Sequence, residues 1–390
     1  MSKVGIIGVG QTQFVRAYPG SVRELVFEGF KEAMKDAQIS TKDIDASIFA
    51  SAPEYDKQRS PAGVIAEYLG LIPQPTCYIE TLCSSSSMAL RMAYAQIKAG
   101  LHDVIAVIGF QKMSEISSME TQERMGRGAD IQWESPFGTM MPAYYALYAQ
   151  AYMAANGLTL EDLAKVRVKA ATYGQLNEKA VYRKSVSLED FKDAESRMGG
   201  PIASPLRVGD CCANADGSSC LILASEKKAK ALSKKPVWIL GVGAASETVN
   251  LAGRSDLNLG LKAGIAAGKE AYTMAGVTPQ DIDVAEVHDC FTIAEIMSYE
   301  NLGFAKPGEG KELIRSGETY KEGRIPVNVD GGLLSKGHPI GATGGSQIRT
   351  IVLQLRGEAG DIQVKDPEIG LVHNIGGVGL YGNVTILGRQ

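Results

Sequence analysis

The chain has 390 residues, of which 45% are hydrophobic and 22% charged, and its formal net charge is −4. This composition is typical of a globular protein and excludes a disordered or fibrous chain, while the lack of excess basic charge argues against nucleic acid or an anionic membrane as a partner. The length exceeds that of most single hydrophobic cores, so we expect more than one subdomain. The N-terminal apolar run is too short for a signal peptide and no stretch reaches membrane-spanning length, which predicts a soluble cytoplasmic protein.

The sequence repeats one series of elements in its two halves. Residues 3–14 and 236–247 each predict a β-branched strand, and residues 30–51 and 268–289 each predict a helix, a Ser/Thr turn ending in Asp-Ile-Asp, and a short strand. The Gly-Val-Gly in both first strands does not complete a dinucleotide-binding motif, so we interpret it as a tight turn at the strand end. This self-similarity indicates a duplicated structure.

The later helices and strands of the two halves also correspond to each other. The segment MALRMAYAQIKAG after Cys83 predicts an amphipathic helix before the strand DVIAVIGF, and SQIRTIVLQLRGEAG predicts a helix before the strand EIGLVHNIGG. In the second half the return strand LYGNVTILG follows at once, whereas its counterpart DGSSCLILAS comes only after residues 111–215. That interruption is helical and rich in Tyr and Met, which suits a lid over a binding cleft.

Strands that alternate with helices in two equivalent halves predict an α/β fold with two mostly parallel sheets covered by helices. We place the N-terminal half at residues 1–118 and 202–232, an inserted domain at 119–201, and the C-terminal half at 233–390. Ligands of such sheets bind near the C-terminal ends of strands, where loops lead into helices. The segments richest in reactive side chains fall at these ends in both halves.

Cys83 lies between a short predicted strand and a helix that begins with serines. Unpaired N–H groups and the helix dipole would favour a thiolate there, although this segment by itself is equally consistent with a packed, unreactive cysteine. Three of the four histidines, His288, His338 and His373, fall in the loops that the repeat assigns to the cleft. Their placement favours the reactive thiol.

The other cysteines do not form a disulfide scaffold or a zinc motif. The six cysteines include no C-x-x-C pair, and their spacing from the histidines matches no metal-ligand pattern. Cys211, Cys212 and Cys220 lie near the return strand of the first half, where we expect them to be packing residues.

Four motifs occur in a fixed order on this duplicated frame: Cys83 with its Ser-rich turn, then HDCF at residues 288–291, GHPIGATG at 337–344 and HNIGG at 373–377. In this combination the chain resembles the thiolase superfamily over essentially its whole length, in particular its sterol-carrier-protein-type branch and the archaeal acetoacetyl-CoA thiolases. The resemblance implies duplicated α/β halves in a layered α-β-α-β-α core with an inserted helical loop domain.

Two positions depart from the better-known thiolases. Those enzymes carry Asn-Glu-Ala-Phe where this chain has HDCF, and Cys-x-Gly where it has Asn374, Ile375 and Gly376. The usual second cysteine is therefore missing from its usual place. Cys290 is its replacement, as in the branch that the chain resembles.

The resemblance implies reversible Claisen condensation of two acetyl-CoA molecules to acetoacetyl-CoA and CoA through an acetyl-cysteine. Cys83 is then the nucleophile with His338 as its base, and Cys290 exchanges the proton at the α-carbon of the second substrate. His288 and His338 would donate hydrogen bonds to the enolate oxygen. We expect no metal or redox cofactor, because the thioester activates its own α-carbon.

Backbone groups and two further side chains complete the expected site. The N–H groups of Cys83 and Gly376 would hold the tetrahedral oxyanion of the first substrate. His373 and Asn374 are candidate substrate contacts.

The resemblance also implies partners. It predicts a homodimer or a dimer of dimers, and a complex with hydroxymethylglutaryl-CoA synthase and a small bridging zinc-ribbon/OB-fold protein that would feed isoprenoid synthesis through the mevalonate pathway. Two other reactions stay open: degradative thiolysis of longer 3-ketoacyl-CoA chains, and ketosynthase-like C-acyl transfer to a non-CoA acceptor. Cys290 favours a non-decarboxylating thiolase, because decarboxylation needs no proton-abstracting thiol. A non-enzymatic lipid-binding protein would be expected to lack Cys83 or His338, and both are present.

Overall fold

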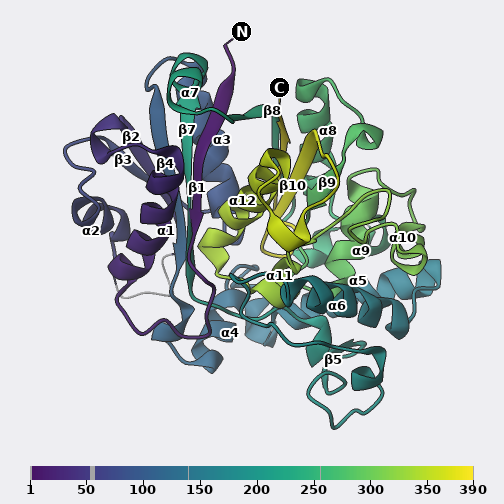
Figure 1. The fold of residues 1–390 in the computed structure, drawn as a ribbon. Helices are drawn as coiled ribbons and strands as arrows, with labels where there is room; N and C mark the ends of the chain where they lie inside the picture. Colours follow the sequence, from purple (N-terminus) through teal and green to yellow (C-terminus); the bar gives the residue numbers. More distant parts are fainter. Residues whose placement is uncertain (1, 53–57, 139, 255, 390) are drawn as a thin grey trace.

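The two halves of the chain contribute the two halves of one sheet. The computed structural model describes residues 2–52, 58–138, 140–254 and 256–389. Within them the strands follow the order β3-β2-β4-β7-β1-β8-β11-β10-β9 (Figure 1). The nine strands of this sheet are β1 (Val4–Gln11), β2 (Ala46–Ala50), β3 (Thr76–Ile79), β4 (Val104–Gln111), β7 (Gly217–Ser225), β8 (Val237–Ser246), β9 (Val284–Glu286), β10 (Ile369–Gly376) and β11 (Tyr381–Gly388).

Most neighbouring strands of this sheet run antiparallel, so the prediction of mostly parallel sheets is wrong. Only β2 with β3, β2 with β4, and β9 with β10 are parallel. The two return strands cause the difference. β7 lies antiparallel between β4 and β1, and β11 lies antiparallel between β10 and β8. The halves join through a short antiparallel contact of β1 with β8, where Gly5 pairs with Trp238 and Ile6 with Val237.

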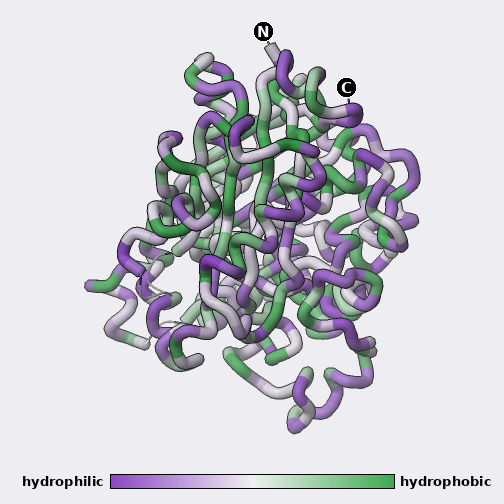
Figure 2. The backbone as a smooth tube through the Cα atoms, turned by 60° about the vertical axis from the view of Figure 1, so that its left-hand side comes forward, coloured by the Kyte–Doolittle hydropathy of each residue, from purple (hydrophilic) through white to green (hydrophobic). Residues whose placement is uncertain are grey.

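Two helices pack between the two halves of the sheet, and others cover the outer face of each half. α1 (Val22–Ala37) packs on β1 and β7, and α8 (Lys262–Ala275) packs on β8 and β11. α3 (Ser85–Lys98) and α12 (Thr343–Arg356) contact each other, and α12 contacts strands of both halves. The buried apolar side chains of α3 and α12 share one core with those of both half-sheets. This arrangement is the α-β-α-β-α layering that the resemblance implies, and Figure 2 shows its apolar strands inside a largely hydrophilic periphery.

The Asp-Ile-Asp turns confirm the duplication at the level of single hydrogen bonds. Each turn is a short 3-10 segment, Thr41–Asp43 in the first half and Pro279–Asp281 in the second. The last aspartate of each turn then holds the start of a neighbouring strand. A carboxylate oxygen of Asp45 accepts the N–H of Val104 at 2.8 Å, and one of Asp283 accepts the N–H of Ile369 at 2.9 Å.

The repeated glycines lie inside strands, so the interpretation as strand-end turns is wrong. A Cβ atom at Gly10 of β1 would collide with the carbonyl oxygen of Gly29 in α1. A Cβ atom at Gly243 of β8 would collide with the carbonyl oxygen of Ala267 in α8. In both halves the glycine lets the covering helix approach the strand closely.

The interrupting segment of the first half folds largely onto the second half. Its helices α5 (Met141–Asn156) and α6 (Leu160–Gly174) contact α9 (Thr292–Asn301). Helix α6 also contacts α10 (Gly310–Ser316) and α11 (Gly332–Lys336). The exact limits at 1–118, 119–201, 202–232 and 233–390 stay a prediction. The remaining elements are α2 (Pro61–Tyr68), α4 (Ser118–Gly126), β5 (Pro201–Ala203), β6 (Leu206–Arg207) and α7 (Glu226–Leu232). Among the residues that the structure describes, no helix is long and apolar enough to cross a lipid bilayer.

Candidate active site

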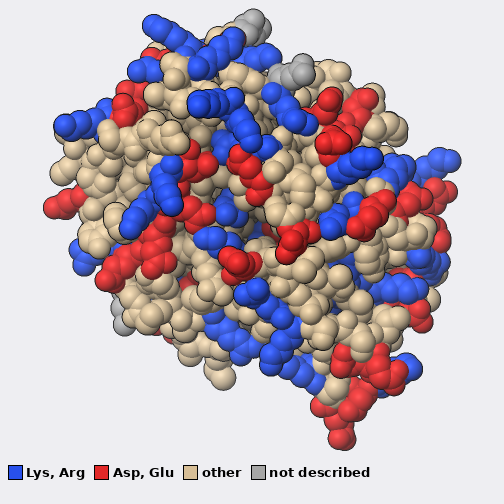
Figure 3. Space-filling model, in the orientation of Figure 1, with Lys and Arg blue, Asp and Glu red and all other residues tan. Residues whose placement is uncertain are grey.

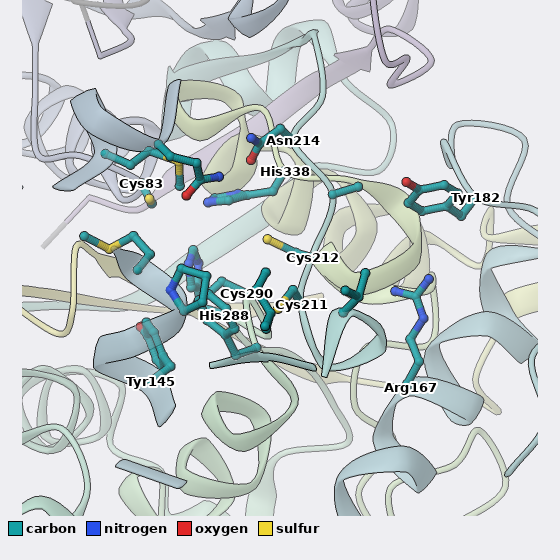
Figure 4. Close-up of a pocket in the computed structure, with 18 of the residues that line it drawn as sticks. Cys83, Tyr145, Arg167, Tyr182, Cys211, Cys212, Asn214, His288, Cys290 and His338 are labelled. Carbon is teal, nitrogen blue, oxygen red and sulfur yellow. The ribbon is translucent and has the colours of Figure 1, made fainter. Parts of the chain in front are cut away.

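Four of the predicted site residues line one cavity of about 220 Å³: Cys83, His288, Cys290 and His338 (Figure 4). The sulfur of Cys83 and one ring nitrogen from each of His288 and His338 lie within 4.8 Å of one another. The two imidazole rings meet edge to face, with their centroids 5.1 Å apart. Three loops from both halves of the chain thus bring a thiol and two imidazoles into contact distance.

The serines after Cys83 fix the turn that carries the thiol. Leu82 has a left-handed backbone with φ of 55°, which is strained for leucine, and Cys83 follows it directly. The hydroxyl of Ser84 donates to the carbonyl of Thr81 at 2.9 Å, and that of Ser85 donates to the carbonyl of Leu82 at 2.6 Å. The hydroxyls of Ser84 and Ser85 therefore bind carbonyl groups of the turn, and Ser84 does not cap the N–H groups of α3. The hydroxyl of Ser86 instead accepts the N–H of Gly345 in the first turn of α12, at 2.9 Å.

Cys83 is held as a neutral thiol. Burial raises the pKa of Cys83 to about 12, while the backbone N–H groups of Gly377 and of Cys83 itself act in the opposite direction on the sulfur. Burial is the largest effect because a thiolate loses its hydration inside the protein. The backbone N–H groups do favour the thiolate, as expected, but burial outweighs them, so the thiolate has to form by proton transfer.

His338 is oriented as a proton acceptor. Its Nδ1 atom lies 2.7 Å from Oγ1 of Thr343, and the Thr343 hydroxyl donates to the carbonyl of Pro339 at 3.0 Å. Since that hydroxyl has one hydrogen, it accepts the Nδ1–H of His338, and Nε2 carries the free lone pair. Burial lowers the pKa of His338 to about 3, so the ring is neutral. The ring can therefore take a proton.

His288 has the opposite tautomer. The Asn374 amide nitrogen donates to Nδ1 of His288 at 2.9 Å, and the Asn374 amide oxygen accepts the hydroxyl of Ser87 at 2.8 Å. With Nδ1 acting as acceptor, the proton of the neutral ring lies on Nε2. Burial, and next the neighbouring His338, hold the pKa of His288 well below its usual value. The site thus offers one imidazole that accepts and one that donates.

Cys290 lies beneath Tyr145 of α5. The ring of Tyr145 stacks on Phe291 with centroids 4.5 Å apart, and its hydroxyl is a hydrogen-bond partner of the Cys290 sulfur. Burial raises the pKa of Cys290 well above the usual thiol value, and the hydrogen bond from Tyr145 acts against this rise. Once deprotonated, such a thiolate is a strong base. Tyr145 of the inserted segment was not identified from the sequence.

Asp289 ties the loop of His288 and Cys290 to the loop of His338. Its carboxylate accepts the N–H of Leu333 at 2.7 Å and of Leu334 at 3.3 Å, at the start of α11, the helix that leads to His338. Burial raises the pKa of Asp289 to about 8. The two loops that carry His288, Cys290 and His338 therefore share a buried anchor.

Cys211 and Cys212 also line the cavity, which corrects the expectation that they only pack near the return strand. The N–H of Cys212 donates to the carbonyl of Cys290 at 2.9 Å, and burial raises the pKa of Cys212 well above the usual thiol value. The direction of strand β7, had it been predicted correctly, would have placed these two cysteines at the cavity. Because β7 is antiparallel to β4, the residues before β7 lie at the edge where β4 ends.

The two remaining predicted residues, Gly376 and His373, do not line the cavity, but the neighbouring Gly377 does. Gly377 lines the cavity and directs its N–H at the Cys83 sulfur, while Gly376, the predicted oxyanion donor, ends β10 one residue earlier. His373 lies outside the cluster: it is fully buried, its Nδ1 lies 3.3 Å from the hydroxyl of Ser298 in α9, and burial lowers its pKa to about 4. The alternation of β10 sends Asn374 to one face and His373 to the other.

The Cys83, His288 and His338 cluster has the spacing of a metal site as well as that of a proton-transfer site. One thiol and two imidazoles are ligands that zinc accepts. The two opposed tautomers, each fixed by a hydrogen bond, also suit a thiol that is deprotonated beside a hydrogen-bond donor. That the protein works without a metal stays a prediction.

A second cavity, of about 270 Å³, meets the first at Cys83. The two cavities share Cys83, Met125, Met141 and Gly377. Beyond these residues the second cavity is lined by three apolar side chains, three charged side chains and a glycine: Ala52, Leu82, Ile340, Glu80, Arg124, Arg127 and Gly128. The thiol therefore lies where two spaces join, one leading past Cys212 and the other past Met125.

Comparisons with known proteins agree with this architecture. Residues 4–227 match the N-terminal domain of thiolases, and residues 243–389 match the family described as thiolase C-terminal domain-like. An acetyl-CoA acetyltransferase of Methanothermobacter thermautotrophicus is 37% identical over 391 residues and is covered completely by this chain, as this chain is by it. Sterol carrier protein 2 of Bos taurus is 31% identical over 96% of this chain and 70% of its own length.

A solved structure of an Ltp2-ChsH2(DUF35) aldolase superposes with a TM-score of 0.86 at 26% identity, over 99% of this chain and 98% of the other. Both family domains, in order and covering nearly all residues, together with full-length relatives of 30% identity or more, confirm the resemblance drawn from the four motifs. The chain belongs to the thiolase family of acyltransferases.

Proposed function

We propose that the protein catalyses reversible Claisen condensation of two acetyl-CoA molecules to acetoacetyl-CoA and CoA, with Cys83 as the acetyl carrier. The observation that carries this proposal is the trio of Cys83, His288 and His338, in which a neutral thiol faces one accepting and one donating imidazole. The name of the archaeal relative, acetyl-CoA acetyltransferase, supports the choice of substrate.

In the first half-reaction the Cys83 sulfur attacks the acetyl carbonyl and its proton passes to Nε2 of His338. The new thioester bond forms as the bond between the acetyl carbon and the CoA sulfur breaks, and the proton on His338 leaves with CoA. The N–H groups of Gly377 and Cys83, which already point at the sulfur, are suited to hold the oxyanion. His338 ends this step neutral, as it began.

In the second half-reaction Cys290 first passes its thiol proton to neutral His338, and its thiolate then takes a proton from the methyl group of a second acetyl-CoA. The Nε2–H of His288 stabilises the enolate oxygen, and the enolate carbon attacks the carbonyl of acetyl-Cys83. As the C–S bond breaks, the Cys83 sulfur takes the proton back from His338, so that all three groups end as they began. The raised pKa of Cys290 favours this role, because a carbon acid as weak as a thioester needs a strong base. In the reverse direction the same groups carry out thiolysis.

The test uses thiolysis of acetoacetyl-CoA by CoA and capture of labelled acetyl-enzyme from acetyl-CoA. We expect Cys83→Ala to abolish both, and Cys290→Ala to form acetyl-enzyme at a rate near that of the wild type while condensing at least 1,000-fold more slowly. Cys220→Ala is the matched control, because that thiol is buried in β7 away from the cavity. Equal inactivity of wild type and Cys83→Ala on every thioester contradicts the proposal.

A second candidate substrate class follows from the cavity beyond Met125. Its apolar wall at Leu82, Met141 and Ile340 favours thiolysis of longer 3-ketoacyl-CoA chains. A chain-length series from C4 to C12 measures this directly. Ala52→Leu, which reduces that space, should lower kcat/KM for the longer chains and leave acetoacetyl-CoA unchanged.

We further propose the partners implied by the resemblance: a homodimer or dimer of dimers, and a complex with hydroxymethylglutaryl-CoA synthase and a small bridging protein, which would draw acetoacetyl-CoA into isoprenoid synthesis. Coupling of this kind suits a condensation that is unfavourable at equilibrium. The name of the Ltp2-ChsH2(DUF35) aldolase, which pairs two components, supports a small protein partner. The exposed residues Thr76 and Cys77 of edge strand β3 support association of two copies. Sedimentation of the pure protein and co-purification with the two partners test these points.

A further inference from the structure

Arg167 and Tyr182 lie at the end of the first cavity opposite Cys83 (Figure 4), and Arg197 lines the same cavity. The guanidinium carbons of Arg16, Arg167 and Arg197 lie 5.1, 5.6 and 5.3 Å from the centroid of the Tyr182 ring. Arg16 and Arg197 each donate to the Tyr182 hydroxyl oxygen, at 2.9 and 3.0 Å. The four residues come from the segment after β1, from α6 and from the loop after α6. In the orientation of Figure 3, Lys and Arg side chains gather between the positions of α4 and β5.

This cluster holds three positive charges without a carboxylate partner in the described part of the chain. None of Arg16, Arg167 and Arg197 has a carboxylate oxygen within 4.0 Å of its nitrogens among those residues. The acidic group that acts on Arg167 is Asp289, whose carboxylate already accepts the N–H groups of Leu333 and Leu334. Like charges brought together in this way repel one another unless an anion joins them.

Arg167 supplies an independent sign of a missing ligand. Only 4% of the residue is exposed, it lines the cavity, and its Nε atom is buried without a hydrogen-bond partner. The carbonyl of Leu334 accepts from its Nη1 atom. A buried guanidinium with an unused donor is costly unless something in the cavity accepts from it.

We propose that this cluster, Arg16, Arg167, Tyr182 and Arg197, binds a phosphate group of the coenzyme A moiety, which rests on the proposed function. Guanidinium forks match the oxygens of a phosphate ester, and several of them together favour a group that carries more than one negative charge. Tyr182 adds a donor, because its oxygen accepts from two arginines and its own hydrogen stays available. The cavity links Arg167, Tyr182 and Arg197 to Cys83, as a carrier with a thioester at one end and phosphates at the other requires.

The test is calorimetric binding of CoA, dephospho-CoA, 4′-phosphopantetheine and pantetheine to the wild type and to the double variant Arg16→Gln/Arg197→Gln. The two side chains are exposed, so their replacement spares the core. We expect the wild type to bind CoA at least 10-fold more tightly than pantetheine. The double variant should lose at least 10-fold in CoA affinity and bind pantetheine within twofold of the wild type. In thiolysis its KM for CoA should rise while kcat stays within twofold.

The matched control is Arg183→Gln/Lys184→Gln, which removes two exposed charges from the same loop and should leave CoA affinity unchanged. Dephospho-CoA and 4′-phosphopantetheine identify which phosphate is held, and a dependence on either supports the site. Wild-type CoA affinity in the double variant overturns the proposal. So does an equal loss for pantetheine, or the same loss in the control. If thiolysis is absent from the wild type but the binding pattern is as expected, the proposed function fails and the phosphate site stands.

Discussion

The Nδ1 atom of His338 and the Oγ1 atom of Thr343 lie 2.7 Å apart, and the Thr343 hydroxyl donates to the carbonyl of Pro339. One turn of chain therefore sets the tautomer of a buried imidazole. Asn374 sets the opposite tautomer in His288, 50 residues earlier in the sequence and on another loop. A thiol between an accepting and a donating nitrogen can lose its proton on one side and have an oxyanion stabilised on the other.

Replacing Thr343 by valine should slow acetylation of Cys83 about 100-fold, within the range that general base catalysis contributes. Valine has the same shape but cannot accept the Nδ1–H, so this buried donor loses its partner and the ring is free to turn or change tautomer. Single-turnover capture of acetyl-enzyme measures the rate. Thr343→Ser retains the hydroxyl and should restore it to within threefold. A Thr343→Val enzyme with normal acetylation would show that the tautomer is set elsewhere.

Replacing Asn374 by leucine should lower condensation about 100-fold, the usual effect of losing one oxyanion donor, and leave acetylation of Cys83 much less affected. Without the Asn374 donor, the His288 ring can carry its proton on Nδ1, and Nε2 then has no hydrogen to donate to the enolate oxygen. Asn383→Leu is the matched control, because Asn383 lies opposite Asn374 on β11 and its amide has no hydrogen-bond partner among the described residues. If both variants lose condensation equally, packing of the two strands explains the loss and the tautomer does not.

Alkylation of Cys83 by iodoacetamide should accelerate about 10-fold per pH unit from pH 6.5 to 9.5 without a plateau. Burial raises the pKa of Cys83 to about 12, so the reactive thiolate fraction keeps increasing through this range. Mass spectrometry of the peptide that contains Cys83 gives the rate, with the same reagent acting on free glutathione as the comparison. A plateau near pH 7 would indicate a resting thiolate paired with an imidazolium.

His373→Asn should leave the KM values nearly unchanged and should make the protein less sensitive to acid. The folded pKa of His373 is about 4, below its unfolded value near 6.5, so its contribution to stability is present above pH 6.5 and is lost as pH falls toward 4. Between pH 7 and pH 5 the wild type should lose about 2 kcal/mol of unfolding free energy relative to the variant. Urea unfolding at both pH values measures this. A large increase in KM would instead support the predicted substrate contact.

Several features were predictable because they depend on neighbours along the chain. The two Asp-Ile-Asp turns, the helix after Cys83 and the hairpin of β10 and β11 follow from local patterns, and the structure contains each of them. The convergence of Cys83, His288, Cys290 and His338 was anticipated from their positions after strands and from the family motifs. Strand direction was not predicted correctly, because periodicity does not say on which side a return strand pairs.

The sequence by itself determined the duplication, the family and the loops that carry the reactive side chains. Each of these depends only on short motifs and on the order of those motifs along the chain. Only the tertiary structure decided the ionisation of Cys83, the tautomers of His288 and His338, the entry of Cys212 into the cavity and the meeting of three arginines at Tyr182. Each of these depends on burial or on a hydrogen bond between residues that are distant in sequence. The local chain does not encode the dielectric environment that its side chains meet after folding.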